Sequence, residues 1–196
     1  MPRRPDLGVL RGAPLEVAPR LLGAVLTHGD VALRVTEVEA YDGAHDPGSH
    51  AHRGRTRRNE VMFGPPGYLY CYFTYGMHVC CNVVCRDEGV AGAVLLRAGE
   101  VIEGIETARA RRPKSSDRDL ARGPARLCRV MDIALDDDGN DLAVGPITLR
   151  LADPVAPEAI RSGPRVGLRA APDWPWRFWL TDDPTVSAYR PAKPRP

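Results

Sequence analysis

The sequence has almost no lysine: only Lys114 and Lys193 occur among its 27 lysine and arginine residues. It also lacks an apolar run close to the roughly 18 residues that a membrane-spanning helix needs. Its first residues, with Arg3 and Arg4 before broken apolar stretches, do not have the pattern of a signal peptide. These absences predict a cytoplasmic protein with no membrane partner. The net charge of +2 excludes a histone-like polycation.

Cysteine is scarce and odd in number. The chain has five cysteines, and none of them forms the C-x2-C pair that is usual in zinc sites. Four of the five stand in apolar, strand-like text, at Cys71, Cys80, Cys81 and Cys85. This pattern predicts buried thiols in a reducing compartment, and it gives no reason to expect a metal or another cofactor.

Most of the chain has the composition of strands, separated by turn text such as GPPG at 64–67. Helices are expected over 14–22 and 124–131, where apolar residues recur at helical spacing. The sequence predicts an α+β fold, a single domain over 1–196 with a curved, mostly antiparallel sheet flanked by helices. Its ends, 1–12 and 191–196, are expected to be loosely ordered. The expected strands are 24–26, 32–41, 68–75, 79–85, 93–98, 147–151, 166–168 and 177–180.

One expected strand carries two carboxylates on an unexpected face. From 31 to 41 the odd positions begin as Val31, Leu33 and Val35 and continue as Glu37 and Glu39. Side chains alternate across a strand, so without a bulge both glutamates share the core face, where an unpaired carboxylate is costly. Either a bulge redirects the end of the strand or this face opens into a cleft. An edge strand with two solvated glutamates is the remaining alternative.

Tyrosines are concentrated in the strand that follows. Tyr68, Tyr70 and Tyr72 share one face, which is either an amphipathic sheet surface or a platform on which a flat ligand stacks. The opposite face has a core pattern, made by Leu69, Cys71 and Phe73. Tyr75 and Met77 then occupy the tip of the hairpin, although hairpin tips are normally polar. They are predicted to enter a partner as a wedge, as apolar side chains do when they unstack DNA bases; an aggregation-prone tip is the alternative.

An arginine-rich loop lies between these elements. The text SHAHRGRTRRN places Arg53, Arg55, Arg57 and Arg58 within six residues. The guanidinium group binds phosphate in a bidentate manner, so this loop is predicted to contact a phosphate backbone. A solvated charged face is one alternative. A metal site is the other, although the spacing of its candidate ligands matches no standard pattern: His45, Asp46, His50 and His52.

The central text resembles the alkyladenine (3-methyladenine) DNA glycosylases, the family that lacks a helix-hairpin-helix. It reads EVEAYDGAHDPGSHAHRGRTRRNEVMF from Glu37, followed by GPPGYLYCYFTYGMHVCCNVV and AVLLRAGE. GPARLCRVMDI, PRVG and WRFWL match farther along, so the resemblance covers nearly the whole chain. It implies a single mixed domain around a curved antiparallel sheet, with double-stranded DNA as its partner. A monomer is usual in this family.

The resemblance also implies roles for individual residues. It selects Glu39 over Glu37 as the general base, and it gives Arg97 the task of helping Glu39 to hold the nucleophilic water. Tyr75 matches the residue that fills the gap in the duplex, with Met77 beside it. The remaining matches form the pocket for the flipped base, where the last of them discourages guanine: Tyr41, His50, Tyr72 and Asn82.

Three positions depart from common family text. Arg57 and Val101 each stand where a proline is common in the family, and Arg122 replaces the asparagine of Asn-Gly-Pro. None of them is a proposed catalytic group, so they bear on the substrate range.

The implied chemistry is base excision. An alkylated or deaminated purine, of the 3-methyladenine, 7-methylguanine, hypoxanthine or ethenoadenine class, is flipped out, and water activated by Glu39 cleaves its glycosidic bond. Because no lysine precedes Lys114, a Schiff-base lyase step has no evident nucleophile, and an abasic product is expected. A metal-dependent hydrolase and a non-catalytic nucleic-acid binding module are the two rival functions.

Overall fold

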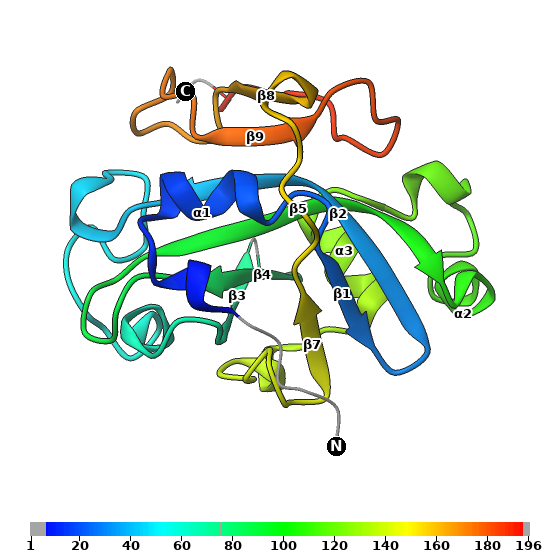
Figure 1. The fold of residues 1–196 in the computed structure, drawn as a ribbon, viewed down its shortest axis with the longest axis horizontal. Coiled ribbons are helices and arrows are strands. Elements are labelled where there is room, and N and C mark those ends of the chain that lie inside the picture. Colours follow the sequence, from blue (N-terminus) through cyan, green and yellow to red (C-terminus); the bar gives the residue numbers. More distant parts are fainter. Residues whose placement is uncertain (1–6, 75, 194–196) are drawn as a thin grey trace.

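A computed structural model describes residues 7–74 and 76–193 (Figure 1). Within these residues, nine strands join into one open sheet in which every strand pair is antiparallel. The main path of the sheet runs β3-β4-β5-β2-β1-β7. In addition, β6 pairs with β5, and β9 pairs with both β2 and β8. The strands are β1 (Val25–His28), β2 (Val31–Tyr41), β3 (Leu69–Thr74), β4 (His78–Val84), β5 (Ala93–Glu103), β6 (Ala121–Arg122), β7 (Ile147–Arg150), β8 (Ile160–Gly163) and β9 (Arg177–Leu180).

Three α-helices accompany the sheet in the described part of the chain: α1 (Pro14–Arg20), α2 (Ile105–Arg111) and α3 (Pro124–Met131). Both α1 and α3 begin with proline, whose fixed φ and missing N–H suit the first helical position. Both place buried residues in the same core as β2 and β5. The α+β class with a mostly antiparallel sheet is therefore confirmed.

Some expectations about individual elements were wrong. Helix α2 and strands β6 and β8 were not foreseen, and 166–168 contains a turn and no strand. Phe73 was expected in the core but is 46% exposed, because β3 runs out beyond the core toward the hairpin tip. All five cysteines are buried free thiols, as predicted.

Two bulges lie side by side in the pairing of β2 with β5, and the one on β2 decides where its carboxylates point. In the pairing of β2 with β5, Val35 lies opposite Gly99 and Glu37 opposite Ala98, so Thr36 is an extra residue. The next partners are Val38 and Leu96, so an extra residue, Arg97, follows at once on β5. An extra residue reverses which side chains face the core. The core side chains of β2 accordingly change from odd to even positions: Val31, Leu33, Val35, Val38 and Ala40.

The bulge thus turns Glu37 and Glu39 away from the hydrophobic core and onto the opposite face of β2. The first alternative drawn from the sequence, a bulge that redirects the end of the strand, is the correct one. Neither carboxylate is solvated, since both side chains are fully buried.

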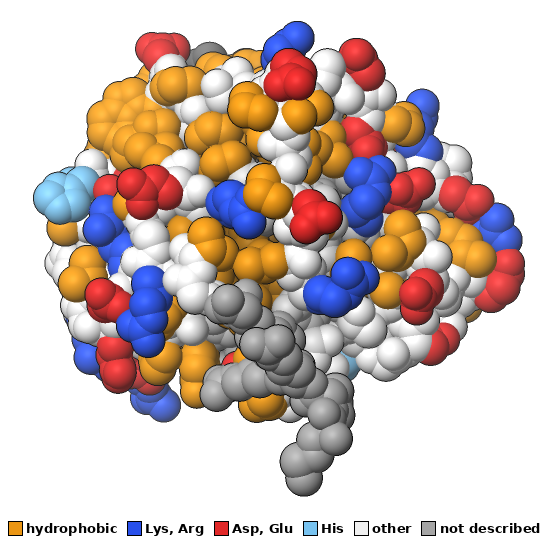
Figure 2. All heavy atoms as spheres, in the orientation of Figure 1, with side chains coloured by type: hydrophobic (Ala, Val, Ile, Leu, Met, Phe, Trp, Pro, Cys, Tyr) orange, Lys and Arg blue, Asp and Glu red, His pale blue; other side chains and the backbone are white. Residues whose placement is uncertain are grey.

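The face of the molecule over α1, β1 and β7 carries positive and negative side chains interspersed with one another (Figure 2). This distribution fits the small net charge of the chain. In the part of the chain that is described, no helix has the length and apolar character needed to cross a membrane.

Candidate active site

The buried carboxylate of Glu39 lies at the centre of the site and contacts three polar groups. Its Oε2 accepts a hydrogen bond from the Tyr41 hydroxyl at 2.8 Å, and its Oε1 accepts one from the Val166 amide at 2.6 Å. Arg97 Nη1 lies 3.3 Å from the same Oε1. A carboxylate offers about four acceptor positions, so about one position remains for a further donor such as water.

Tyr41 connects Glu39 to a cavity. Burial, followed by the neighbouring Glu39 carboxylate, raises the pKa of Tyr41 well above its usual value, so the hydroxyl stays protonated and donates to Glu39. The ring of Tyr41 lines a cavity of about 460 Å³. This volume falls in the range of roughly 300–1,000 Å³ that is typical of small-molecule pockets.

The four residues expected to hold a flipped base all line this one cavity: Tyr41, His50, Tyr72 and Asn82. Tyr72 stacks on Tyr70 with ring centroids 5.7 Å apart, and its ring meets the His50 imidazole edge-on at 4.5 Å. Asn82 donates a hydrogen bond from Nδ2 to the Tyr70 carbonyl at 3.1 Å, which fixes its amide in the wall. The wall is therefore aromatic with a few fixed polar groups, as a pocket for a flat heterocycle requires.

His50 lines the cavity and is also exposed to solvent. Its Nδ1 lies 3.0 Å from the Tyr70 hydroxyl. Partial burial, together with the nearby Arg58 guanidinium, lowers the pKa of His50 below its usual value, so the ring is neutral at pH 7. Burial raises the pKa of Tyr70 to about 12, so that hydroxyl keeps its proton. A neutral His50 has one ring nitrogen that donates and one that accepts.

Arg165, which the sequence reasoning missed, holds the back of the site. Its buried guanidinium forms a bidentate pair with buried Asp46 and donates to the Ala40 carbonyl at 2.9 Å. It also lies 4.7 Å from the centre of the Tyr41 ring. Arg165 precedes Val166, so the same contacts place the Val166 amide on Glu39. The PRVG text was visible in the sequence, but only the folded chain shows what it touches.

The arginine loop lies outside this packed region. Arg53, Arg55, Arg57 and Arg58 are all exposed. Arg58 donates to the Phe73 carbonyl at 3.3 Å and lines the cavity, while Arg55 lies 5.9 Å from the centre of the Phe63 ring. The loop therefore borders the cavity mouth with exposed positive charge.

The hairpin tip is described only in part. Met77 is 69% exposed, as its predicted role in a wedge requires. Tyr75 lies outside the described residues. Phe73, unexpectedly exposed, adds apolar surface close to the tip.

The candidate metal ligands turn to separate partners. Asp46 binds Arg165, His50 contacts Tyr70, and His52 Nδ1 lies 3.0 Å from the Ala44 carbonyl. Within residues 7–74 and 76–193, no three His, Cys, Asp or Glu side chains form a group able to hold a metal ion.

Comparison with known proteins identifies the relatives of this chain. Residues 9–184 match the model of the methylpurine-DNA glycosylase (MPG) family. Similar proteins from several bacteria carry the assigned name 3-methyladenine DNA glycosylase. The one from Streptomyces avermitilis is 56% identical over 190 residues, covering 92% of this chain and 89% of that protein.

Two further relatives carry the same assigned name. The Nocardia farcinica protein is 55% identical over 185 residues, covering 90% of this chain and 87% of its own length. The Mycobacterium tuberculosis protein is 48% identical over 191 residues, covering 93% of each chain.

Proposed function

Because the chain belongs to the methylpurine-DNA glycosylase family, and is a DNA glycosylase that hydrolyses N-glycosyl bonds, we propose that it excises alkylated and deaminated purines from duplex DNA with water activated by Glu39. The observation that carries this proposal is the buried Glu39 carboxylate, joined through Tyr41 to an aromatic cavity. The proposed substrates are 3-methyladenine, 7-methylguanine, hypoxanthine and ethenoadenine. The partner is double-stranded DNA bound by a cytoplasmic monomer.

The cavity receives the flipped base. Its tyrosine faces attract a purine that methylation at N3 or N7 has made cationic, by roughly 0.5–2 kcal/mol. A neutral lesion such as hypoxanthine instead needs hydrogen bonds, which His50 and the fixed amide of Asn82 supply from the wall. Met77 and Tyr75 enter the duplex in place of the extruded nucleotide, offsetting part of the few kcal/mol that flipping costs.

Departure of the base leaves positive charge on the sugar. The Glu39 carboxylate stabilises this charge and takes a proton from the water that attacks C1′. Its one remaining acceptor position is available to that water, because Tyr41, Val166 and Arg97 occupy the others. The wall of the cavity contains neither Lys114 nor Lys193, in keeping with hydrolysis that leaves an abasic site.

The test is base release from duplex oligonucleotides that each carry one of the four lesions, assayed with and without EDTA. We expect Glu39→Gln to bind lesion DNA normally and to lower the release rate by about 100- to 10,000-fold, the usual contribution of a general base. The matched control is Glu103→Gln, which removes an exposed carboxylate from the end of β5.

Each rival function has its own outcome in this assay. Undiminished release by Glu39→Gln would contradict its role as the base. Binding without any abasic product from the parent enzyme would indicate a nucleic-acid binding module, and loss of activity in EDTA would indicate a metal-dependent hydrolase.

A further inference from the structure

Four charged side chains are buried together beside the cavity: Glu37, Glu39, Arg97 and Arg177. Glu37 is the common partner of the two arginines. Its Oε1 accepts from Arg97 Nε at 2.8 Å and from Arg177 Nε at 2.7 Å. Buried charges are tolerated only when they are paired and hydrogen-bonded, and this group of two anions and two cations meets that condition.

Arg97 is shared unequally between the two glutamates. Its Nε lies 2.8 Å from Glu37, whereas its Nη1 lies 3.3 Å from Glu39. The guanidinium is a rigid planar fork, so the bond that Glu37 makes with Nε sets the direction of Nη1. Arg97 also sits at the bulge of β5, where no ladder partner fixes its backbone opposite β2. Glu37 therefore makes the shorter of two bonds that aim Arg97; the other runs from Nη2 to the Ser187 hydroxyl, at 3.5 Å.

The C-terminal part of the chain completes the group. We call residues 183–187 the strap. The Ser187 amide donates to Glu37 Oε2 at 2.6 Å, and its hydroxyl donates to Oε1 at 2.9 Å. Arg177 Nη2 donates to the Ser187 carbonyl at 2.8 Å. Glu37 thus accepts four hydrogen bonds, two of them from the strap.

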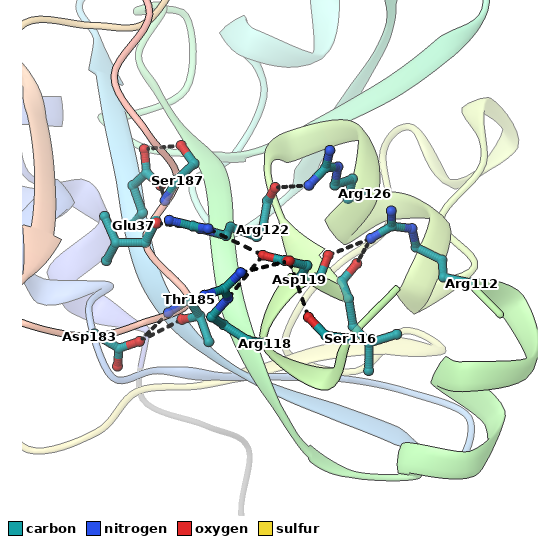
Figure 3. Close-up of polar contacts among 12 residues, drawn as sticks. Glu37, Arg112, Ser116, Arg118, Asp119, Arg122, Arg126, Asp183, Thr185 and Ser187 are labelled. Carbon is teal, nitrogen blue, oxygen red and sulfur yellow. Dashed lines mark hydrogen bonds and ion pairs between the residues drawn. The ribbon is translucent and has the colours of Figure 1, made fainter. Parts of the chain in front are cut away.

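The strap is itself anchored at three further points, the first of which is the ion pair between Asp183 and Arg34 at 2.8 Å. The hydroxyls of Thr185 and Thr36 lie 2.8 Å apart, and Thr36 is the bulge residue of β2. Arg122 donates from Nε to the Val186 carbonyl at 2.7 Å and pairs with Asp119 at 3.2 Å (Figure 3). Arg122, which differs from the common family residue, therefore contacts the strap. It is not part of the wall of the base cavity.

From these contacts we propose that Glu37 is a positioning residue for base excision, which acts through Arg97 to keep Glu39 free for water and is held in place by the strap. The proposal rests on the roles proposed above for Glu39 and Arg97. Burial alone would raise the pKa of Glu37, but the guanidiniums of Arg97 and Arg177 and the Ser187 amide outweigh it and lower the pKa, so the carboxylate stays charged. Without that charge, Arg97 moves onto Glu39 and occupies the acceptor position of the water.

Single-turnover kinetics test the proposal, with enzyme in excess over a duplex carrying the lesion that the parent releases fastest. We expect Glu37→Gln to lower the rate constant by about tenfold or more, as a displaced catalytic group does. The Kd for the same duplex should stay within about twofold, because Glu37 does not line the cavity. A purely structural role would lower the amplitude and the Tm while leaving the rate constant of the folded enzyme unchanged.

Ser187→Ala provides a milder second variant, because it removes the hydroxyl, which donates to Glu37 and accepts from Arg97 Nη2, but keeps the Ser187 amide and the charge of Glu37. It should lower the same rate constant by a smaller factor, and it decides the question if Glu37→Gln fails to fold. Glu103→Gln should match the parent. Parental rate constants in both site variants, with Glu39→Gln inactive, would overturn this proposal and leave the proposed function intact. A parent that releases no base would overturn both.

Discussion

The two sides of the cavity hold their charges in opposite ways. Behind the cavity, Glu39, Arg97, Asp46 and Arg165 are buried, and each is fixed by close partners from other strands or loops. At the mouth, the four arginines of residues 53–58 are exposed, and Arg58 donates one hydrogen bond to the sheet, at the Phe73 carbonyl. The same molecule therefore contains a rigid charged interior and a loosely held charged rim.

The difference corresponds to two kinds of work. Groups that stabilise developing charge must be oriented before the reaction, because reorientation during it would raise the barrier. Contacts to phosphate act through charge and counterion release, which depend little on fixed geometry. The interior should therefore tolerate almost no change, while the rim should tolerate substitutions that alter only the affinity for DNA.

The largest effect is expected where an interior pair is broken. Asp46→Asn preserves shape but leaves the buried Arg165 guanidinium without its bidentate partner. Removing one partner of a buried pair typically costs about 3–5 kcal/mol, so the free energy of unfolding in urea should fall by that amount.

A matched control for this loss is available at the surface. Asp87→Asn removes an ion pair of similar length between Asp87 and Arg11. The Asp87 side chain is 70% exposed and the Arg11 side chain 68%. Its cost should lie within about 1 kcal/mol of zero. Equal losses for the two variants would show that burial does not distinguish these pairs.

A smaller effect of the same origin is expected in acid. The folded-state pKa of Glu37 is lowered: burial opposes the charge, but Arg97 and Arg177 outweigh it. A carboxyl of this kind contributes stability that is present above its unfolded pKa and is lost as the pH falls through the folded value. The free energy of unfolding should thus decline below about pH 4.5, with a shallower decline in Glu37→Gln. The free energy of unfolding of both proteins is measured by urea titration between about pH 7 and pH 3. An equally steep decline in the two proteins would contradict this prediction.

Much of the interior could be anticipated from the sequence. The odd-position run from Val31 to Glu39 left three alternatives, a bulge, a cleft or a solvated edge strand, and the chain has the bulge at Thr36. The family resemblance selected four residues that do line one cavity. Side chains alternate strictly along a strand, so the unusual position of Glu37 and Glu39 could be recognised from the local pattern alone.

The missing parts depend on contacts between distant segments. Glu37 meets Ser187, which lies 150 residues farther along the chain, and Asp46 meets Arg165 at a separation of 119. No local period encodes such pairs. The error at Phe73 has a related cause, since alternation says which face a side chain takes but not where the core beneath it ends. Helix α2 is short, with a single buried residue, Ala108, and so gives little apolar periodicity.

The smallest effect on the folded protein is expected at the rim. Replacing Arg53 and Arg57 together with alanine should leave the Tm and the single-turnover rate constant at saturating enzyme unchanged, because both side chains are exposed. Affinity for lesion duplex should fall, and the slope of log Kd against log salt should decrease by about 0.9 for each phosphate that the loop no longer neutralises.

Arg109→Ala is the matched control, since Arg109 lies on α2, away from this loop in Figure 1, and pairs with Asp117 and Glu106. An unchanged salt slope in the double variant would mean that the loop does not bind the phosphate backbone. A reduced rate constant would mean that rim and interior are coupled, most directly through Arg58, which lies in the same loop and in the cavity wall.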